Sequence, residues 1–402
     1  MTIRTKANAV GILLAAAILA GGGVPGLAPP VAAAEGKGRR MAPMDEARSR
    51  DWLARWEKNI LADSRNRYCD RELGEEIGWL VTPFLEGFYW GYEATGDTRW
   101  VDMLVDWADS WIRRGVKEPD GYIGWPKKGA AGTKVDDLDD FVADSLLGEA
   151  MALRPVVRMA GEVLVTPKLK EKYGAKAEGY IELAERVFEK WDKRGAWREA
   201  KGGAISVVLP YGIDAGTGRW TEGYARRDAP GAGFSHPDNK ANLTARWLLA
   251  LHDVTRKPIY RERAEKWFRL LRSRLAPRDD GKFKIWNYWE PAGPWDLKAD
   301  GSPKHWVGVH PNGGYYSVDV EAIVDAHEHG LAFTAEDIER LIATALAEKR
   351  YWPALAPYDG TIRKDFEEKL KPESWGGLGA APWYLALQSR LRQAPQPETG
   401  RQ

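Results

Sequence analysis

Apolar residues recur at helical spacing along most of the chain, so the pattern predicts an almost entirely helical protein. Pro258 suits a first helical turn, and Thr334 followed by Glu336 and Asp337 is a helix-capping signature. Residues 204–209 are the one run that could form a strand. The predicted helices span residues 45–62, 75–95, 98–114, 136–161, 177–193, 240–255, 258–275, 318–329, 334–349 and 379–391.

A repeat of 80 residues underlies this pattern, because Trp100, Tyr180 and Tyr260 occupy equivalent positions in three of the predicted helices. The same interval relates two further columns, Leu104, Ala184 and Ala264 and then Trp107, Val187 and Trp267. The alternative to a true repeat is that amphipathic helices match at this interval by coincidence. Helix pairs that cannot bury their apolar faces alone must stack. The repeat therefore predicts an all-α fold, an (α/α)n toroid or incomplete barrel of helical hairpins.

Long loops rich in Gly, Pro and Trp separate the predicted helices, at residues 115–134, 195–239, 279–312 and 351–377. Loops of this length inside a compact domain usually have a function. In a toroid of hairpins we expect them to gather at one rim. No linker divides the chain, so residues 35–392 are predicted to form a single catalytic domain, and residues 393–402 a disordered tail.

The N-terminal residues 1–34 have the pattern of a secretory signal peptide. Arg4 and Lys6 precede a short apolar run, and Ala32-Ala33-Ala34 offers a cleavage site. Gly21-Gly22-Gly23 would break a membrane-spanning helix. We therefore expect a secreted or periplasmic protein with no membrane anchor after cleavage.

The charge balance is close to neutral, with 59 Lys and Arg against 58 Asp and Glu. A neutral protein has no general attraction for nucleic acid, so we expect no nucleic-acid partner. Cys69 is the only cysteine, which excludes an intramolecular disulfide. The fold must therefore be stabilised by its core.

All six histidines lie between His236 and His329, in a region with three strings of polar and aromatic residues. The first string, 234–242, contains His236, Asn239 and Asn242. One of its polar residues could simply cap the following helix. Capping uses a single side chain, however, and leaves the others available for a site.

The second string, 285–290, places Tyr288 between Trp286 and Trp289, and Trp306 follows in the third. Exposed aromatic rings in a loop suit stacking on sugar rings. The alternative is a hydrophobic plug that fills the hole of the toroid. Tyr89 is on a predicted helix that could line this hole.

The third string, 305–316, contains a turn signal at Asn312-Gly313-Gly314, so His310 and Tyr315 can point into one space. His327 and His329 are two residues apart and face different ways on a helix, which argues against a shared zinc ion. The sequence predicts no metal and no cofactor.

Two carbohydrate chemistries suit a secreted toroid lined with aromatic residues. Glycoside hydrolysis needs two carboxylates across the bond. Elimination in a uronic acid needs donors that neutralise the substrate carboxylate, and a Tyr or His that removes a proton. The concentration of His, Asn and Tyr favours elimination.

With these residues, the chain resembles the alginate and glucuronan lyases built on an α/α toroid, and most of all polysaccharide lyase family 38. The resemblance implies a lyase acting on an acidic polysaccharide by β-elimination. It implies that His236 and Asn239 neutralise the substrate carboxylate and that Tyr288 or Tyr315, with His310 nearby, is base and acid. The substrate-binding residues would be Asn242, Trp286, Trp289, Trp306, Arg226, Arg227 and Tyr89.

Two alternatives remain. A glycoside hydrolase of the same toroid class would use Glu290, Glu86 or one of the residues Asp136–Asp140 as its carboxylates. A non-catalytic glycan-binding protein would hold its ligand by stacking alone.

Overall fold

The computed structural model describes residues 44–62, 67–128, 141–209, 212–214, 220–221 and 233–393. Expectations about the segment 1–34, the residues after 393, Asp136–Asp140, Arg226 and Arg227 lie outside these ranges. In the described part of the chain, no helix is both long and apolar enough to cross a membrane.

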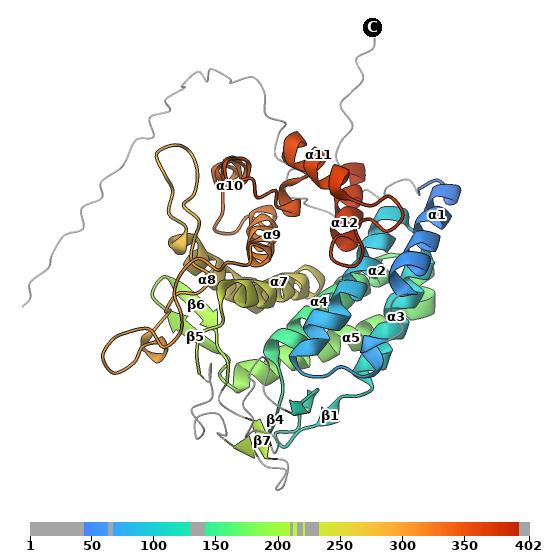
Figure 1. The fold of residues 1–402 in the computed structure, drawn as a ribbon. Coiled ribbons are helices and arrows are strands. Elements are labelled where there is room, and N and C mark those ends of the chain that lie inside the picture. Colours follow the sequence, from blue (N-terminus) through green and yellow to red (C-terminus); the bar gives the residue numbers. More distant parts are fainter. Residues whose placement is uncertain are drawn as a thin grey trace, which may run out of the picture.

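Five helices form an inner ring, in which each packs against the next and the last packs against the first (Figure 1). The short helix η5 Pro353–Leu355 closes the ring between its fourth and fifth helices. The inner helices are α2 Thr82–Thr95, α4 Leu146–Val165, α7 Asp238–Thr255, α9 Gly314–Glu328 and α12 Ala381–Gln393. The sequence-based prediction of an α/α toroid is confirmed.

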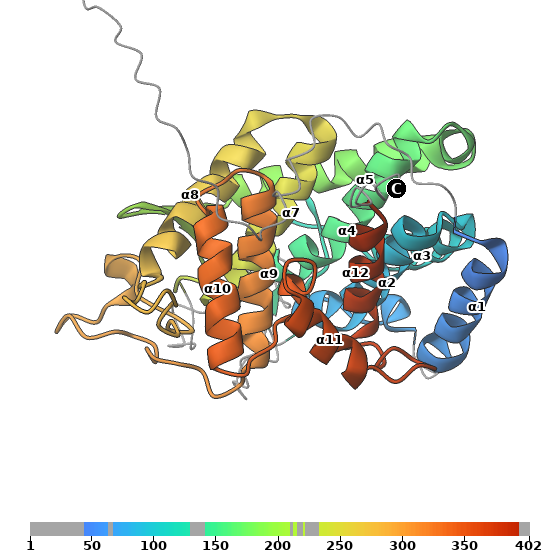
Figure 2. The same ribbon diagram turned by 90° about the horizontal axis from the view of Figure 1, so that it is seen from above.

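The remaining helices lie outside this ring, and Figure 2 shows α10 beside α9 and α3 beside α2. Each outer helix follows or precedes an inner one in the chain, as expected for stacked hairpins. The outer helices are α1 Glu46–Trp56, α3 Thr98–Ile112, α5 Pro167–Lys193, α8 Pro258–Arg274, α10 Ala335–Ala347 and α11 Gly360–Lys369. The sequence pattern missed α11, whose buried face consists of only Ile362 and Phe366.

Side-chain caps explain where several helices begin. The capping residues accept a hydrogen bond from a free backbone N–H of the first turn. At α10, Thr334 and Asp337 form the reciprocal capping box that the sequence predicts. Proline at the first position starts α5 and α8. The remaining cap residues are Asp45, Asp97, Ser145 and Asp359.

The 80-residue repeat coincides with three outer helices. Trp100 on α3, Tyr180 on α5 and Tyr260 on α8 are all buried. The residues in the two other columns are buried as well. The repeat therefore marks the faces with which the outer helices pack onto the ring.

Close packing in this layer depends on glycine. A Cβ atom added at Gly87 of α2 would overlap the ring of Trp56, and one added at Gly91 would overlap the ring of Trp100. Both tryptophans are fully buried and their rings pack edge to face, 5.5 Å apart. The absence of side chains at these glycines lets the outer layer approach the ring.

The described strands are short and lie in the loops that join the helices. They form β1 Val116–Lys117 with β2 Ile123–Gly124, and β5 Trp197–Ala200 with β6 Gly203–Ser206. The predicted strand at 204–209 overlaps β6. A further sheet consists of four strands, which lie in the order β3 Lys127–Lys128, β4 Phe141–Ala143, β7 Gly212–Asp214 and β8 Trp220–Thr221.

The centre of the ring contains a buried network of ion pairs. Asp325 of α9 accepts hydrogen bonds from Arg246 of α7 at 2.7 Å and from Arg154 of α4 at 3.2 Å. Arg390 of α12 lies 3.6 Å from the same carboxylate, and Arg154 also pairs with Glu86 of α2 at 2.6 Å. The network therefore connects all five inner helices.

Asp325 is the common partner of three arginines. Burial opposes its ionisation, but the guanidinium groups of Arg246, Arg154 and Arg390 outweigh this effect and hold the pKa of Asp325 well below its ordinary value. A neutral side chain at this position would leave each of these arginines with a single carboxylate partner, Glu321, Glu86 or Glu328.

We expect Asp325→Asn to lower the free energy of unfolding by about 3–5 kcal/mol, because three buried arginines lose the ionised carboxylate that they share. Urea denaturation at neutral pH measures this change. Glu368→Gln is the control, since Glu368 pairs with Lys364 on the surface and both side chains are largely exposed. A loss for Asp325→Asn no larger than for the control would contradict the proposed role of the network.

Candidate functional site

The described parts of the loops that precede the inner helices lie at one end of the ring, because every inner helix follows an outer helix and runs in the same direction. This end contains the N-termini of α2, α4, α7, α9 and α12, and is called the mouth of the ring below. The expectation that long loops gather at one rim is confirmed by this topology.

Four aromatic residues, called the rim cluster, lie together at the mouth: Tyr288, Trp306, His310 and Tyr315. The ring of His310 lies 4.6 Å from Tyr288, 4.7 Å from Tyr315 and 6.1 Å from Trp306. Trp306 is 48% exposed, whereas the other three rings are partly buried. The structure thus brings together four residues that the sequence singled out from two separate strings.

The buried residue Tyr316 fixes the loops under this cluster. Its hydroxyl donates to the carbonyl of Trp286 at 2.9 Å and accepts from the backbone N–H of His310 at 3.2 Å. The carbonyl of Tyr288 accepts from the N–H of Asp238, at the start of α7. The rim cluster is therefore tied to the ends of α7 and α9.

The phenol of Tyr288 has a raised pKa. Burial raises the pKa of Tyr288 above its ordinary value, and the negative charges of Asp319, Glu75 and Asp238 add to this effect. A phenol with a raised pKa is a hydrogen-bond donor at neutral pH and a poor base.

His236 and Asn242 are buried and bonded within the protein. His236 Nδ1 lies 2.9 Å from Ser206 Oγ, and burial lowers the pKa of His236 to about 3, with a further contribution from the charge of Lys240. Asn242 donates to Asp319 at 2.8 Å and accepts from Trp267 at 2.7 Å. The structure therefore places both residues in the wall beneath the mouth.

Asn239 lies one turn before Asn242 on the same face of α7. It is 1% exposed, and neither its amide nitrogen nor its amide oxygen has a hydrogen-bond partner in the described part of the chain. Asp319, which bonds Asn242, also accepts from the indole N–H of Trp286. Burial raises the pKa of Asp319 to about 8, and the charge of Asp238 adds to the shift.

The other aromatic candidates lie in the interior. Trp286 is 3% exposed and packs edge to face on Tyr316. Trp289 is fully buried and donates to the carbonyl of Ser235. Tyr89 is also buried, with the guanidinium of Arg158 over its ring. These positions fit the hydrophobic plug that the sequence left open as an alternative.

The sequence analysis missed Glu75 and Lys240, which form an ion pair of 2.7 Å at the mouth. Glu75 also accepts from the indole N–H of Trp79 at 2.9 Å, and 12% of its side chain is exposed. Its charge acts on Tyr288. Lys240 lies within the first polar string, but no spacing rule connects it with a glutamate 165 residues away.

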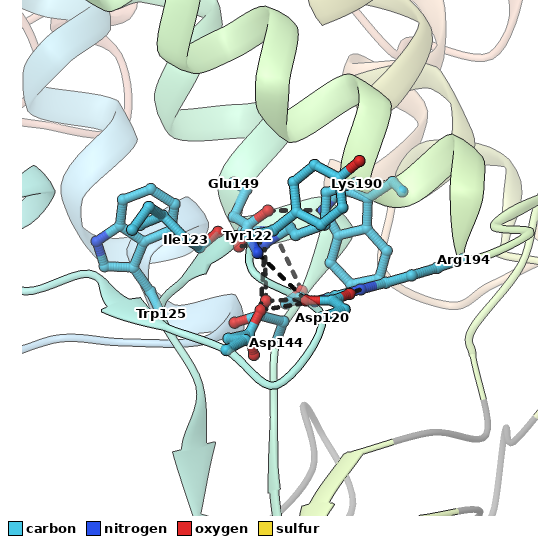
Figure 3. A network of polar contacts seen from close by, with 12 residues as sticks. Asp120, Tyr122, Ile123, Trp125, Asp144, Glu149, Lys190 and Arg194 are labelled. Carbon is cyan, nitrogen blue, oxygen red and sulfur yellow. Dashed lines mark hydrogen bonds and ion pairs between the residues drawn. The ribbon is translucent and has the colours of Figure 1, made fainter. Parts of the chain in front are cut away.

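A second polar centre lies between α4 and α5, on the outer side of the mouth (Figure 3). The fully buried Lys190 donates to Asp144 at 2.7 Å and to Glu149 at 2.6 Å. Arg194 pairs with Glu118 at 2.7 Å and with Asp144 at 3.2 Å. We call this group the lysine centre.

Carboxyl groups in the lysine centre crowd each other. Burial raises the pKa of Glu118 to about 9, helped by its hydrogen bond to Asp144 and by the charge of that residue. A Cβ atom at Gly124 would overlap the carboxylate oxygens of both Glu118 and Asp144. Glu118 is therefore a neutral acid at pH 7, bonded to an ionised Asp144. In the described residues, no group of three or more His, Cys, Asp or Glu could hold a metal ion.

No family model matches the chain, and no curated protein matches it. Among solved structures, it is similar to the α-1,6-mannanase GH76A of Salegentibacter sp. HEL1_6, with 13% identity and a TM-score of 0.46 over 85% of this chain and 97% of the mannanase. An inactive variant of the same enzyme in complex with α-1,6-mannotetrose gives 12% identity and the same TM-score, over 86% and 97%.

The expectation of a polysaccharide lyase is corrected by these findings, because the similar structures are glycoside hydrolases and not lyases. This correction also withdraws the expected membership of a lyase family, the expected alginate or glucuronan substrate and the expected acidic polysaccharide partner. At this identity, no residue of the mannanases is assigned to this chain.

We expect Glu118→Gln to stabilise the protein at pH 8 by about 2–4 °C in melting temperature, and not at pH 5. Between about pH 4.5 and 9 the folded chain holds a proton on Glu118 that the unfolded chain has lost, so stability falls as pH rises. Glutamine donates the same hydrogen bond without this cost. Thermal melts across this range measure the difference, with Glu368→Gln as control; a stabilisation independent of pH would refute the assignment.

Proposed function

We propose that this protein is a glycoside hydrolase that binds a glycan at the mouth of the ring. The observation that supports this function best is the rim cluster beside the ion pair of Glu75 and Lys240. Partly exposed rings at a loop-lined end suit the C–H faces of sugars, and the ion pair provides a carboxylate at the same end of the ring.

Glu75 is the carboxylate that we assign to catalysis. The ammonium of Lys240 and the indole N–H of Trp79 both donate to its Oε1 atom and hold the side chain in place. An ionised carboxylate acts in hydrolysis as nucleophile or as base. Lys240, which bonds Glu75, is two residues from Asp238, whose N–H donates to the carbonyl of Tyr288, so the start of α7 connects the carboxylate with the loop of the rim cluster.

The second carboxylate must donate a proton to the leaving oxygen. The sequence offers Glu86, Glu290 or one of Asp136–Asp140 for this role, and the last group lies outside the described residues. Glu86 is held by Arg154 in the centre of the ring. Glu290 accepts a hydrogen bond from Asn287 at 2.8 Å.

Export fits this function, since the signal-like segment 1–34 would bring the enzyme to glycans outside the cell or in the periplasm. The buried residues His236, Asn239 and Asn242 have a supporting role in this proposal. His236 and Asn242 hold the start of α7 through hydrogen bonds, and from there Lys240 reaches Glu75, whereas Asn239 is buried beside them without a side-chain partner in the described residues.

We expect Glu75→Gln to lower kcat by about 10²–10⁴-fold, because the amide cannot act as nucleophile or base. Reducing ends released from a panel of soluble neutral polysaccharides, a mannan, a xylan and a β-glucan, measure the rate. Glu76→Gln is the matched control, since this neighbouring glutamate is more exposed and pairs with Lys127. Full activity of Glu75→Gln would exclude the assigned role, and binding without released ends would favour a non-catalytic glycan-binding protein.

We expect Trp306→Ala to raise KM by about threefold to tenfold and to leave kcat nearly unchanged. The ring is 48% exposed at the edge of the rim cluster, so its loss removes stacking area without touching the carboxylate. Initial rates over a range of substrate concentrations separate the two constants. A fall in kcat with constant KM would place Trp306 in the chemical step instead.

A further inference from the structure

An open depression of about 700 Å³ lies beside the lysine centre, on the outside of the ring. One wall is a single face of α5, formed by Glu182, Arg186, Glu189 and Lys193 at intervals of four, three and four residues. The other wall is the turn at 120–122. The depression and the mouth share one end of the toroid, because the C-terminal end of α5 lies beside the start of α4.

The turn at 120–122 is held rigidly against α5. Asp120 accepts from the guanidinium of Arg194 at 2.8 Å, and the same guanidinium is bonded from below to Glu118 and Asp144. Figure 3 shows Asp120 joined to Arg194, with the ring of Tyr122 pointing away from Asp144. The lysine centre therefore positions both the charged floor and the aromatic edge of the depression.

The charges that line the depression balance. Its lining contains three acids, Asp120, Glu182 and Glu189, and three bases, Arg186, Lys193 and Arg194. A ligand with net charge would meet as much repulsion as attraction here. A neutral ligand with many hydroxyl groups meets donors and acceptors in alternation, because each hydroxyl can both donate and accept.

Two of the lining groups have unused bonding capacity. Within the described residues, neither Glu182 nor Arg186 forms an ion pair or a side-chain hydrogen bond. Tyr122 is partly exposed, and the ammonium of Lys193 lies 5.6 Å from the centroid of its ring. An aromatic ring that lines the same depression as unpaired polar groups suits a sugar, which offers C–H groups on its face and hydroxyls at its edge.

We infer that this depression is a second carbohydrate site, which binds a neutral oligosaccharide without hydrolysing it. Tyr122 stacks on the sugar ring, and Glu182 and Arg186 bond its hydroxyls. The choice of a glycan over another neutral polyol rests on the proposed function of the mouth. A polysaccharide longer than the mouth would then be held at two places on the same end of the protein.

Affinity electrophoresis of the full chain tests this site, in native gels containing the same mannan, xylan or β-glucan. We expect Tyr122→Ala and Arg186→Ala to weaken retention by about threefold to tenfold, and to leave the hydrolysis of short oligosaccharides unchanged. Arg269→Ala is the matched control, because Arg269 is an exposed arginine on the outer helix α8. Circular dichroism confirms that each variant is folded.

The outcomes separate the two proposals. Unchanged retention in both variants, or no retention of the wild type by any of the three polysaccharides, overturns the second site. Retention that depends on Trp306 alone overturns it too, because the mouth would then account for all binding. Retention that depends on Tyr122 with no reducing ends released supports the second site and rejects the hydrolase.

Discussion

The toroid depends on one buried carboxylate. Asp325 meets arginines from α4, α7 and α12, and Arg154 extends the network to Glu86 of α2. Apolar packing already limits how the helices approach each other, as the rings of Trp56 and Trp100 at Gly87 and Gly91 show. Charges that must be paired in a dry interior restrict the rotation and axial position of the helices further, since a displacement separates the paired groups. The ion pairs thus align the inner helices along the ring.

That alignment determines what meets at the mouth. Asn242 and Arg246 are on one face of α7, so the helix that the central network holds also brings Asn242 to Asp319. The start of the same helix presents Lys240 to Glu75. The aromatic rim is then added by a loop between α8 and α9, fixed through Tyr316. The same helix, α7, therefore contributes both to the central ion-pair network and to the residues at the mouth.

The protein contains two polar centres of different design. In the ring, arginines and carboxylates pair closely and the pKa of Asp325 is lowered. In the lysine centre, carboxyl groups crowd each other so that Glu118 keeps its proton. This arrangement brings Arg194 and Asp120 to the surface with fixed geometry. Rigid charged groups of this kind lose little entropy when a ligand bonds to them.

The sequence by itself determined the helical hairpins, the toroid and the position of the long loops, because helical periodicity and the 80-residue repeat are local or regular patterns. It also singled out Tyr288, His310, Tyr315 and Trp306, since unusual clusters of polar and aromatic residues are visible along the chain. Only the tertiary structure decided which aromatic residues are exposed: Trp286 and Trp289 have the same composition signal as Trp306 and lie in the interior. Pairs such as Glu75 with Lys240, or Asp325 with three arginines, join residues far apart in the chain, and no local pattern encodes them. The pKa of Tyr288, and with it the chemistry open to the site, follows from burial, which arises only when the ring closes.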